Sequence, residues 1–178
     1  MPPTSRPQLE LVADCSRCSG LCCVLLPFRS GDGFGADKPG GTPCSHLRPD
    51  DLCGIHDRLA DSGWPGCAAY DCRGAGQRVT QVTYAGRSWR DQDNLPEMAA
   101  VFSVMRVLHG LLAQLEPTPG DPGSVRSRVL ALTGGSPDDL LALDLVELEA
   151  EVAAAVSDPG ARPSGSGSGT AGAGRAAG

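Results

Sequence analysis

The clearest pattern of hydrophobic positions lies after residue 92 and predicts helices. Between residues 95 and 115, apolar side chains recur every three or four positions, which is the spacing of one helical face. Asn94 stands before this run as a helix cap and Pro96 falls in the first turn, so we expect a helix that ends near Leu115. His109 lies one step off the apolar face, where we expect partial exposure. The face itself consists of Leu95, Met98, Phe102, Met105, Leu108, Leu112 and Leu115.

Capping residues predict two more helices in the second half of the chain. Ser124 precedes a short helix that is expected to end near Leu132, before two consecutive glycines. The segment 136–139, Ser-Pro-Asp-Asp, begins a third helix that is expected to continue without a break through residue 156 and to be acidic on one side. We expect the three helices to pack as a small bundle against the N-terminal part.

The first half of the chain shows weaker periodicity. Residues 73–86 fit a helical face in part and strand alternation in part, and we favour a helix that leaves Cys72. Residues 28–43 are rich in glycine and are expected to form a mobile loop, because no strand–GxGxxG–helix frame of a nucleotide site surrounds them.

Cysteine is concentrated in this first half. All eight cysteines lie between residues 15 and 72, and four of them fall within the stretch DCSRCSGLCC, residues 14–23. Packing gives no reason for this, since alanine or valine would fill the same space without the reactivity. Zinc and iron–sulfur clusters are held by four thiolates, so eight cysteines could complete two four-ligand sites or one site with spare thiols. The candidate ligands are Cys15, Cys18, Cys22, Cys23, Cys44, Cys53, Cys67 and Cys72.

The alternatives to a metal or cluster are disulfides and redox chemistry. The N-terminus has no apolar run of signal-peptide length, and the apolar stretch at residues 22–28 is far too short to cross a bilayer. We therefore expect a cytoplasmic protein, in which thiols stay reduced, and this favours a metal over a disulfide framework. The spacing departs from the bacterial ferredoxin run in its second gap, and no βαβ pattern of a thioredoxin-like protein surrounds the CxxC pair.

The adjacent cysteines Cys22 and Cys23 carry further information. In an extended segment neighbouring side chains point to opposite faces, so the two sulfurs would face two different sites. On a helix, by contrast, Cys22 would share a face with Cys15 and Cys18. Because Gly20 weakens a regular helix here, we expect a loop or a distorted turn.

Other polar residues near the cysteines are weaker candidates. His46 and His56 follow Cys44 and Cys53 by two and three positions and are possible additional ligands, although ordinary polar loop roles are favoured. Acidic residues also adjoin cysteines, and we expect them to be solvated charges rather than hydrogen-bond acceptors of the site. These are Asp14, Asp57 and Asp71.

The cysteine order resembles that of the YkgJ-type CxxCxxCC family of zinc- or iron-chelating domains. The matching positions cover residues 14–73, and the resemblance implies that the eight cysteines hold zinc or iron. Where the family usually has tyrosine after its C-x-I step, this chain has His56. The segment is also similar to the N-terminal module of actinobacterial pentapeptide-repeat proteins, but the repeats are absent here. The residues that carry the resemblance are the eight cysteines with Ile55, Arg58 and Tyr70.

Together these patterns predict a small, irregular, cysteine-rich metal-binding module followed by a mainly α-helical C-terminal part and a disordered tail. The expected boundaries are an N-terminal lead over 1–13, the cysteine-rich domain over 14–92, about three helices over 93–157 and a low-complexity tail over 158–178.

The composition limits the function further. A formal net charge of −6 argues against a nucleic-acid module. The sequence has no Ser/His/Asp set, nucleophile elbow or paired acids in a recognisable frame. It therefore predicts a non-catalytic zinc- or iron(-sulfur)-binding protein. The alternative is an iron–sulfur or metal-dependent redox enzyme, or an accessory protein, with an open coordination site. Expected partners are the metal ion and a protein bound through the helical region, with neither nucleic acid nor membrane.

Overall fold

Helices make up most of the part of the chain that the structure describes. The computed structural model describes residues 11–115 and 124–157, and no strand of a sheet forms in these two ranges. Two isolated β-bridges, Phe28 to Lys38 and Leu47 to Cys53, hold the loops instead. The mainly helical C-terminal part is therefore confirmed. The predicted tail and residues 1–10 of the lead lie outside the described residues.

Short helices dominate the first half, and longer ones follow. The first half contains η1 (Cys15–Arg17), α1 (Leu21–Leu25), η2 (Ser30–Asp32), η3 (His56–Arg58), α2 (Pro65–Ala69), α3 (Ala75–Arg78), the π-helical turn η4 (Val79–Thr83) and α4 (Trp89–Gln92). The second half contains α5 (Leu95–Gln114), α6 (Val125–Leu132), α7 (Pro137–Leu141) and α8 (Leu145–Ser157).

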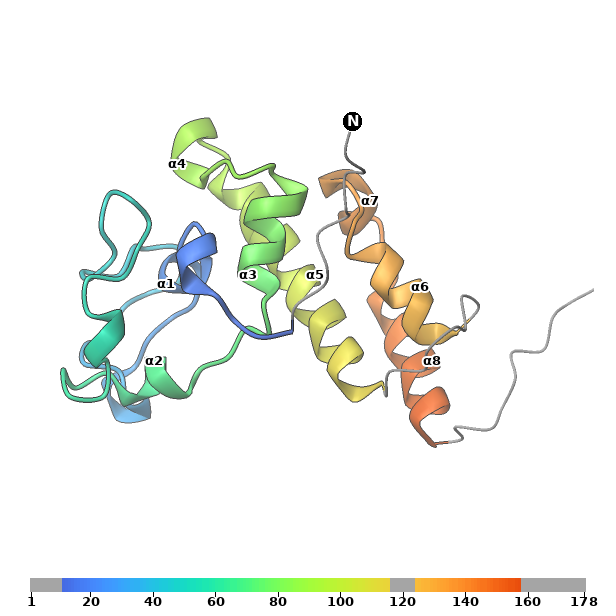
Figure 1. Ribbon diagram of the computed structural model, residues 1–178, viewed down its shortest axis with the longest axis horizontal. Coiled ribbons are helices and arrows are strands. Elements are labelled where there is room, and N and C mark those ends of the chain that lie inside the picture. The colour runs from blue at the N-terminus through green and yellow to red at the C-terminus, as the bar shows by residue number, and fades with distance from the viewer. Residues whose placement is uncertain (1–10, 116–123, 158–178) are drawn as a thin grey trace, which may run out of the picture.

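Helix α5 is the central element of the fold. It runs between α3 on one side and the group of α6, α7 and α8 on the other, while α1, α2 and their loops lie beyond α3 (Figure 1). The apolar face predicted for it is confirmed over most of its length, because its central members are buried. By length and composition α5 could also cross a membrane, but the other helices cover much of its apolar surface. The buried residues of α5 are Met98, Val101, Phe102, Met105, Leu108, His109, Leu111 and Leu112.

His109 is fully buried, so the expectation of partial exposure was wrong. Its Nδ1 lies 2.5 Å from the carbonyl oxygen of Arg73, which ties α5 to the turn just after Cys72. The reason is that α5 is covered on more than one side, so positions next to the main apolar stripe are also enclosed. Burial lowers the pKa of the imidazole, which favours its neutral form.

The last helices follow the capping signals, with one break that the pattern did not predict. Ser124 accepts a hydrogen bond from Ser127 N–H at the start of α6, as expected. At the start of α7, Ser136 and Asp139 form a reciprocal capping box. The predicted continuous third helix is nevertheless two helices, α7 and α8. Asp144 accepts a hydrogen bond from Glu147 N–H at 3.0 Å and so caps a new helix where the old one would have continued.

The segment after Cys72 is helical, as favoured from the sequence. Helix α3 widens into the π-helical turn η4, in which Val79 and Thr80 are buried. The hydroxyl of Tyr84 then donates to Glu97 at 2.7 Å, which fastens this segment to α5. A single core therefore includes side chains from both the cysteine-rich part and the helical part. We call it the helix core, and its members include Leu21, Ala75, Val79, Met98, Phe102 and Met105.

A second and much smaller core lies under the loops. It consists of Phe28, Cys44, Ile55 and Trp64, and we call it the loop core. The glycine-rich loop 28–43 packs onto it, since Phe34 stacks on Phe28 with ring centroids 4.6 Å apart. Phe28 and Lys38 also exchange two backbone hydrogen bonds, of 2.8 and 3.0 Å, which hold the two ends of the loop together.

Candidate metal centre

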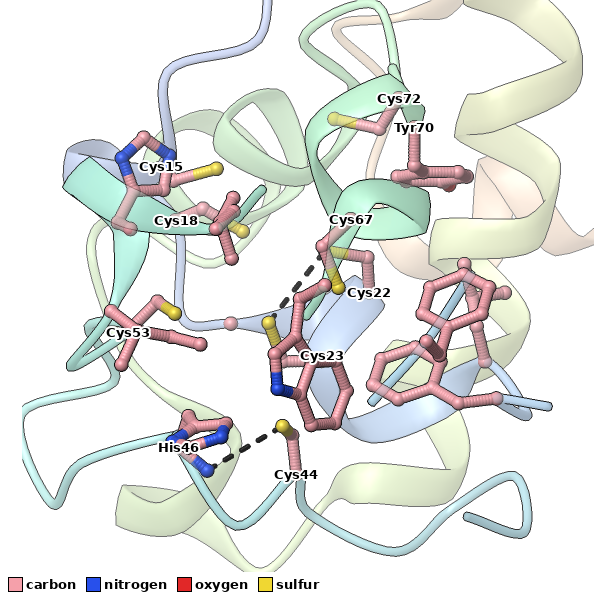
Figure 2. A pocket seen from close by; sticks show the side chains of 18 of the residues that line it. Cys15, Cys18, Cys22, Cys23, Cys44, His46, Cys53, Cys67, Tyr70 and Cys72 are labelled. Atoms are coloured by element: carbon pink, nitrogen blue, oxygen red, sulfur yellow. Dashed lines mark hydrogen bonds between the residues drawn. The ribbon is translucent and has the colours of Figure 1, made fainter. Parts of the chain in front are cut away.

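All eight cysteines line one cavity in the cysteine-rich part of the chain. The cavity has a volume of about 290 Å³, and the sulfurs from both ends of the segment 15–72 surround it (Figure 2). Each of the eight is a free thiol. The remaining wall is largely apolar and includes Phe28, Ile55 and Trp64 of the loop core. Residues that are far apart in the sequence are thus brought to one place.

The first cysteine turn is fixed against α3 and η4. Asp14 caps η1 by accepting a hydrogen bond from Ser16 N–H at 3.0 Å, and its own N–H donates to the side chain of Gln77. Ser19 N–H donates to the hydroxyl of Thr80 at 3.0 Å. The segment with Cys15 and Cys18 is therefore held in place by residues some 60 positions later in the chain.

Helix α1 carries the adjacent pair, and the prediction of a loop or a distorted turn at this pair was wrong. Gly20, with a φ of +69°, begins the helix, so the glycine expected to weaken a helix instead allows one to start. A side chain at this position would also meet Leu47 at 2.6 Å. The sulfurs of Cys22 and Cys23 lie 4.0 Å apart at the edge of the cavity.

Two linked turns bring Cys44 and Cys53 to the same cavity. Cys44 N–H donates to the carbonyl of Cys23 at 3.0 Å, which places this turn beside α1. The bridge between Leu47 and Cys53 then joins the two turns, and Gly54 N–H donates to the carbonyl of His46 at 2.8 Å. These backbone hydrogen bonds position both sulfurs without help from a sheet.

The last two cysteines flank the end of helix α2. Cys67 lies within α2, and Cys72 lies just before α3, where Ala75 N–H donates to the Cys72 carbonyl at 3.0 Å. Helix α3 also approaches Cys18 closely. A Cβ atom on Gly76 would lie only 2.7 Å from the Cys18 sulfur, so glycine is required for this contact.

Backbone N–H groups point at three of the sulfurs. Cys44 Sγ accepts from His46 N–H at 3.5 Å. Cys18 receives hydrogen bonds from the N–H groups of Gly20 and Leu21, and Cys53 receives one from Ile55. In each case the donor lies two residues after the cysteine, with a further donor three residues after Cys18. Such donors stabilise the thiolate rather than the thiol.

Burial acts in the opposite direction on most of the thiols. It raises the pKa of Cys18 and of Cys67 to about 12 and that of Cys15 to about 11, and it also raises the pKa of Cys53. Neighbouring cysteines add to the increase, because one thiolate disfavours another close by. Without a cation these groups are therefore protonated at neutral pH, and a bound cation would supply the charge that their ionisation needs.

Cys23 differs from the other thiols. A hydrogen bond from Cys22 lowers the pKa of Cys23 and raises that of Cys22, and the nearby ammonium of Lys38 acts in the same direction on Cys23. Lys38 is the one lysine in the chain, and it is buried. Its Nζ donates to four carbonyl oxygens at 2.7–3.1 Å, those of Val24, Leu26, Pro39 and Thr42. A fixed positive charge thus lies beside the cysteines.

The two histidines also line the cavity but differ in their surroundings. His46 packs edge-on against Trp64 with ring centroids 5.1 Å apart, whereas His56 lies exposed in η3. Of the acidic residues near cysteines, Asp57 and Asp71 are exposed, as expected for solvated charges, and Asp14 is half-buried. Asp14 and Asp71 each accept a backbone N–H in their own turn.

Two residues near the cavity, Lys38 and Asp51, carried no signal in the sequence, and a third, Tyr70, was indicated only by the family resemblance. Lysine is seldom buried, so the position of Lys38 was not predictable from its type. Asp51 binds Ser88 and Arg90 of the α4 segment across a long stretch of chain. Tyr70 also lines the cavity, and its hydroxyl is buried without a hydrogen-bond partner among the described residues. Burial raises the pKa of this phenol to about 12.

The donor set suits the metal that the sequence implies in its chemistry but does not converge on one point. Within residues 11–115 and 124–157, no three Cys, His, Asp or Glu side chains converge closely enough on one point to hold a metal ion. The chemistry fits nevertheless, since eight soft sulfur donors surround one cavity and N–H donors favour three of them as thiolates. Binding would require the sulfurs to turn toward a common point by side-chain rotation.

Comparison with known proteins gives one relative. The chain is 40% identical over 153 residues to the uncharacterized protein YybG of Bacillus subtilis (strain 168). The match covers 80% of this chain but 55% of the relative, so the chain spans little more than half of that protein's length. No protein-family model and no solved structure match the chain. The resemblance to the YkgJ-type family therefore remains a prediction from the cysteine pattern.

Proposed function

We propose that the chain is a thiolate-rich metal-binding protein that holds zinc or iron, the iron as ions or as an iron–sulfur cluster, and has no catalysis of its own. The observation that carries this proposal is the gathering of eight free thiols around one cavity. Free thiols in such number have no structural use by themselves, because smaller apolar side chains would pack equally well. Thiolate groups in sets of four are the usual ligands of structural zinc and of iron–sulfur clusters.

The small loop core supports the same proposal. The loop core under residues 28–64 has four buried side chains, and one of these is itself a cysteine. A unit of this size has little apolar surface to offset its conformational entropy. Metal binding at a structural site contributes about 10–16 kcal/mol of apparent free energy at neutral pH, which exceeds the stability of many whole domains. The proposed role of the metal is therefore to hold these loops folded.

Electrostatics around the cavity favour a cationic occupant. Deprotonating several buried thiols without a cation is unfavourable, as the raised pKa values of Cys18 and Cys67 indicate. A divalent metal offsets that charge, and four thiolates around it leave a net charge of about −2. Lys38 would partly balance this remaining charge on the side of Cys23 and Cys44.

A second candidate function rests on the size of the cavity. At about 290 Å³ it lies close to the lower end of ordinary ligand pockets, which begin near 300 Å³. A single ion needs less space than this. The alternative is thus a cluster or metal site with an open coordination position that serves a redox enzyme or accessory protein. A complete set of cysteine ligands on every bound metal would count against it.

The proposal is tested by metal analysis of the full chain purified without oxygen. We expect zinc or iron in native mass spectra, and a visible absorption band where the metal is an iron–sulfur cluster. The variant Cys67→Ala should lose metal, whereas Ala69→Ser, an exposed substitution on the same helix α2, should keep it. A metal-free wild-type chain, with all thiols free or joined in disulfides, would refute the proposed function.

A further inference from the structure

Seven of the eight cysteines divide between the two cores of the molecule, and Cys15 packs on neither. Cys18, Cys22 and Cys72 pack against the helix core, around α5 and α3. Cys23, Cys53 and Cys67 pack against the loop core, and Cys44 is one of its four members. No cysteine belongs to both cores. In the sequence the loop-side members follow one another from Cys23 to Cys67, between Cys22 and Cys72 of the other group.

A separate recess identifies the fourth cysteine of the first group. Beside the main cavity lies a recess of about 10 Å³, which is close to the smallest space that holds one water molecule or ion. Gly76 and Phe102 form part of its wall. The cysteines that line it are Cys15, Cys18, Cys22 and Cys72, and none of the other four does so.

Backbone contacts separate the groups in the same way. Cys18 and Cys72 both adjoin the start of α3, through the close approach of Gly76 and the hydrogen bond from Ala75. Cys44 is hydrogen-bonded to the backbone of Cys23, and the turn that holds Cys53 is bridged to the turn after Cys44. Each group is therefore held by its own set of contacts.

The adjacent pair is where the groups meet. Successive residues of an α-helix point about 100° apart around its axis, so Cys22 and Cys23 of α1 can face different cores. Cys22 packs on the helix core and Cys23 on the loop core, although their sulfurs are 4.0 Å apart. Cys15 packs on neither core, but it lines the recess together with the other helix-side cysteines.

We infer that the chain holds two separate four-thiolate metal sites that meet at the Cys22–Cys23 pair. One uses the helix-side set, Cys15, Cys18, Cys22 and Cys72, and the other uses the loop-side set, Cys23, Cys44, Cys53 and Cys67. This inference rests on the proposed function and adds the number of sites and the ligands of each. Four thiolates complete the coordination of zinc, or hold one iron–sulfur cluster, so neither site needs His46 or His56. Two complete sites also leave no open position for a substrate.

The test maps which thiols the metal protects from alkylation. The full chain is purified without oxygen, treated with iodoacetamide, and analysed by peptide mass spectrometry beside native mass spectra that count the metal. In Cys44→Ser we expect half of the metal to be lost and the remaining loop-side thiols to be labelled, while the helix-side set stays protected. Cys18→Ser should give the reverse labelling pattern. The same residues labelled in both variants would overturn the inference.

The neighbouring pair supplies a matched comparison. Cys22→Ser and Cys23→Ser change successive residues of the same short helix, so their local effects on α1 are similar. In Cys22→Ser we expect iodoacetamide to label the remaining helix-side thiols, and in Cys23→Ser we expect it to label the remaining loop-side thiols. A single pattern for both variants would mean that the pair belongs to one site.

A measurement on the wild-type chain tests the same inference without variants, which could fail to fold. The metal-free chain receives one equivalent of Zn²⁺ and is then alkylated. In each molecule that binds one zinc, we expect the four protected thiols to be either the whole helix-side set or the whole loop-side set. Protection of four thiols drawn from both sets in the same molecule, or saturation at one zinc per chain, would overturn the two-site inference but leave the proposed function standing. A chain that binds no zinc here and carries neither zinc nor iron as purified would overturn both.

Discussion

Replacing Gly76 by alanine should disturb the helix-side cysteines, although Gly76 is not itself a proposed ligand. Gly76 lies in helix α3, and its φ is not in the left-handed region, so the backbone itself would accept alanine. The added Cβ would lie 2.7 Å from Cys18 Sγ and 3.7 Å from the ring of Phe102. Because non-bonded heavy atoms prefer separations of about 3.5–4.0 Å, the sulfur would have to move by roughly 1 Å.

The expected effect has two parts. Overpacking of this kind costs about 1–3 kcal/mol of folding free energy, while alanine in place of glycine within a helix gains about 0.5–1 kcal/mol. Metal–sulfur distances tolerate a deviation of only about 0.2 Å, so a displacement of roughly 1 Å should also weaken binding at the helix-side set. Rotation of the Cys18 side chain would relieve the clash, but it would also move the sulfur away from its present place among the helix-side thiols.

Gly110 provides the matched control. It lies within helix α5, and a Cβ atom there would meet nothing within 4 Å. Gly110→Ala should therefore show the helical gain alone. The difference between the two variants isolates the clash, which we expect to be about 1–3 kcal/mol in favour of Gly110→Ala.

The assay is urea denaturation followed by circular dichroism, together with the metal content of each variant after dialysis against a weak chelator. We expect Gly76→Ala to unfold at lower urea than Gly110→Ala and to retain less metal. If Gly76→Ala matched Gly110→Ala in both stability and metal content, the close packing of α3 against Cys18 would have no role in the site.

Three further predictions concern charge and capping. The metal-free chain should lose stability as pH rises from about 9 toward 12. Burial raises the pKa of Cys18 and Cys67 from 9.0 to about 12, so the unfolded chain releases these protons at lower pH than the folded chain does. Melting temperatures that stayed level across this range would contradict the prediction, and the metal-loaded chain, whose ligands are already ionised, is the control. Lys38→Met should cost at least about 2 kcal/mol in urea denaturation, since four carbonyls lose a charged donor, whereas the exposed Arg48→Met should change stability far less; equal effects would refute this. Asp144→Ala should destabilise the chain by about 0.5–2 kcal/mol through loss of the α8 cap, and an unchanged melting temperature would show that the cap contributes nothing.

The helices were predictable where their signals are local. The apolar spacing of α5 and the serine caps of α6 and α7 lie within a few residues of the elements they specify, and the structure confirms them. The break before α8 was missed because Asp144 can either continue a helix or cap a new one, and the sequence alone does not decide between these. His109 was misjudged because burial on its side of α5 depends on α3, a distant segment.

The candidate site was predictable in its chemistry but not in its arrangement. The cysteine spacing indicated a shared site, and the structure brings the eight thiols to one cavity. Which sulfur faces which core depends on how α1 and the loops pack, and this is a property of tertiary contacts rather than of spacing. The prediction for Cys22 and Cys23 shows the difficulty, since Gly20 was taken to weaken a helix that it in fact begins.

The order of the two sets along the chain has a consequence for assembly. The loop-side cysteines, 23 to 67, lie entirely between Cys22 and Cys72 of the helix-side set, so one ring of chain is nested inside the other. If the inner ring closes first, the path from Cys22 to Cys72 shrinks from about 50 residues to about six, which lowers the loop-closure entropy of the outer ring by about 2 kcal/mol. Because such a coupling is reciprocal, closing the outer ring first lowers the closure entropy of the inner ring by the same amount. The nested order therefore makes each set assist the loading of the other to the same degree, whichever metal binds first.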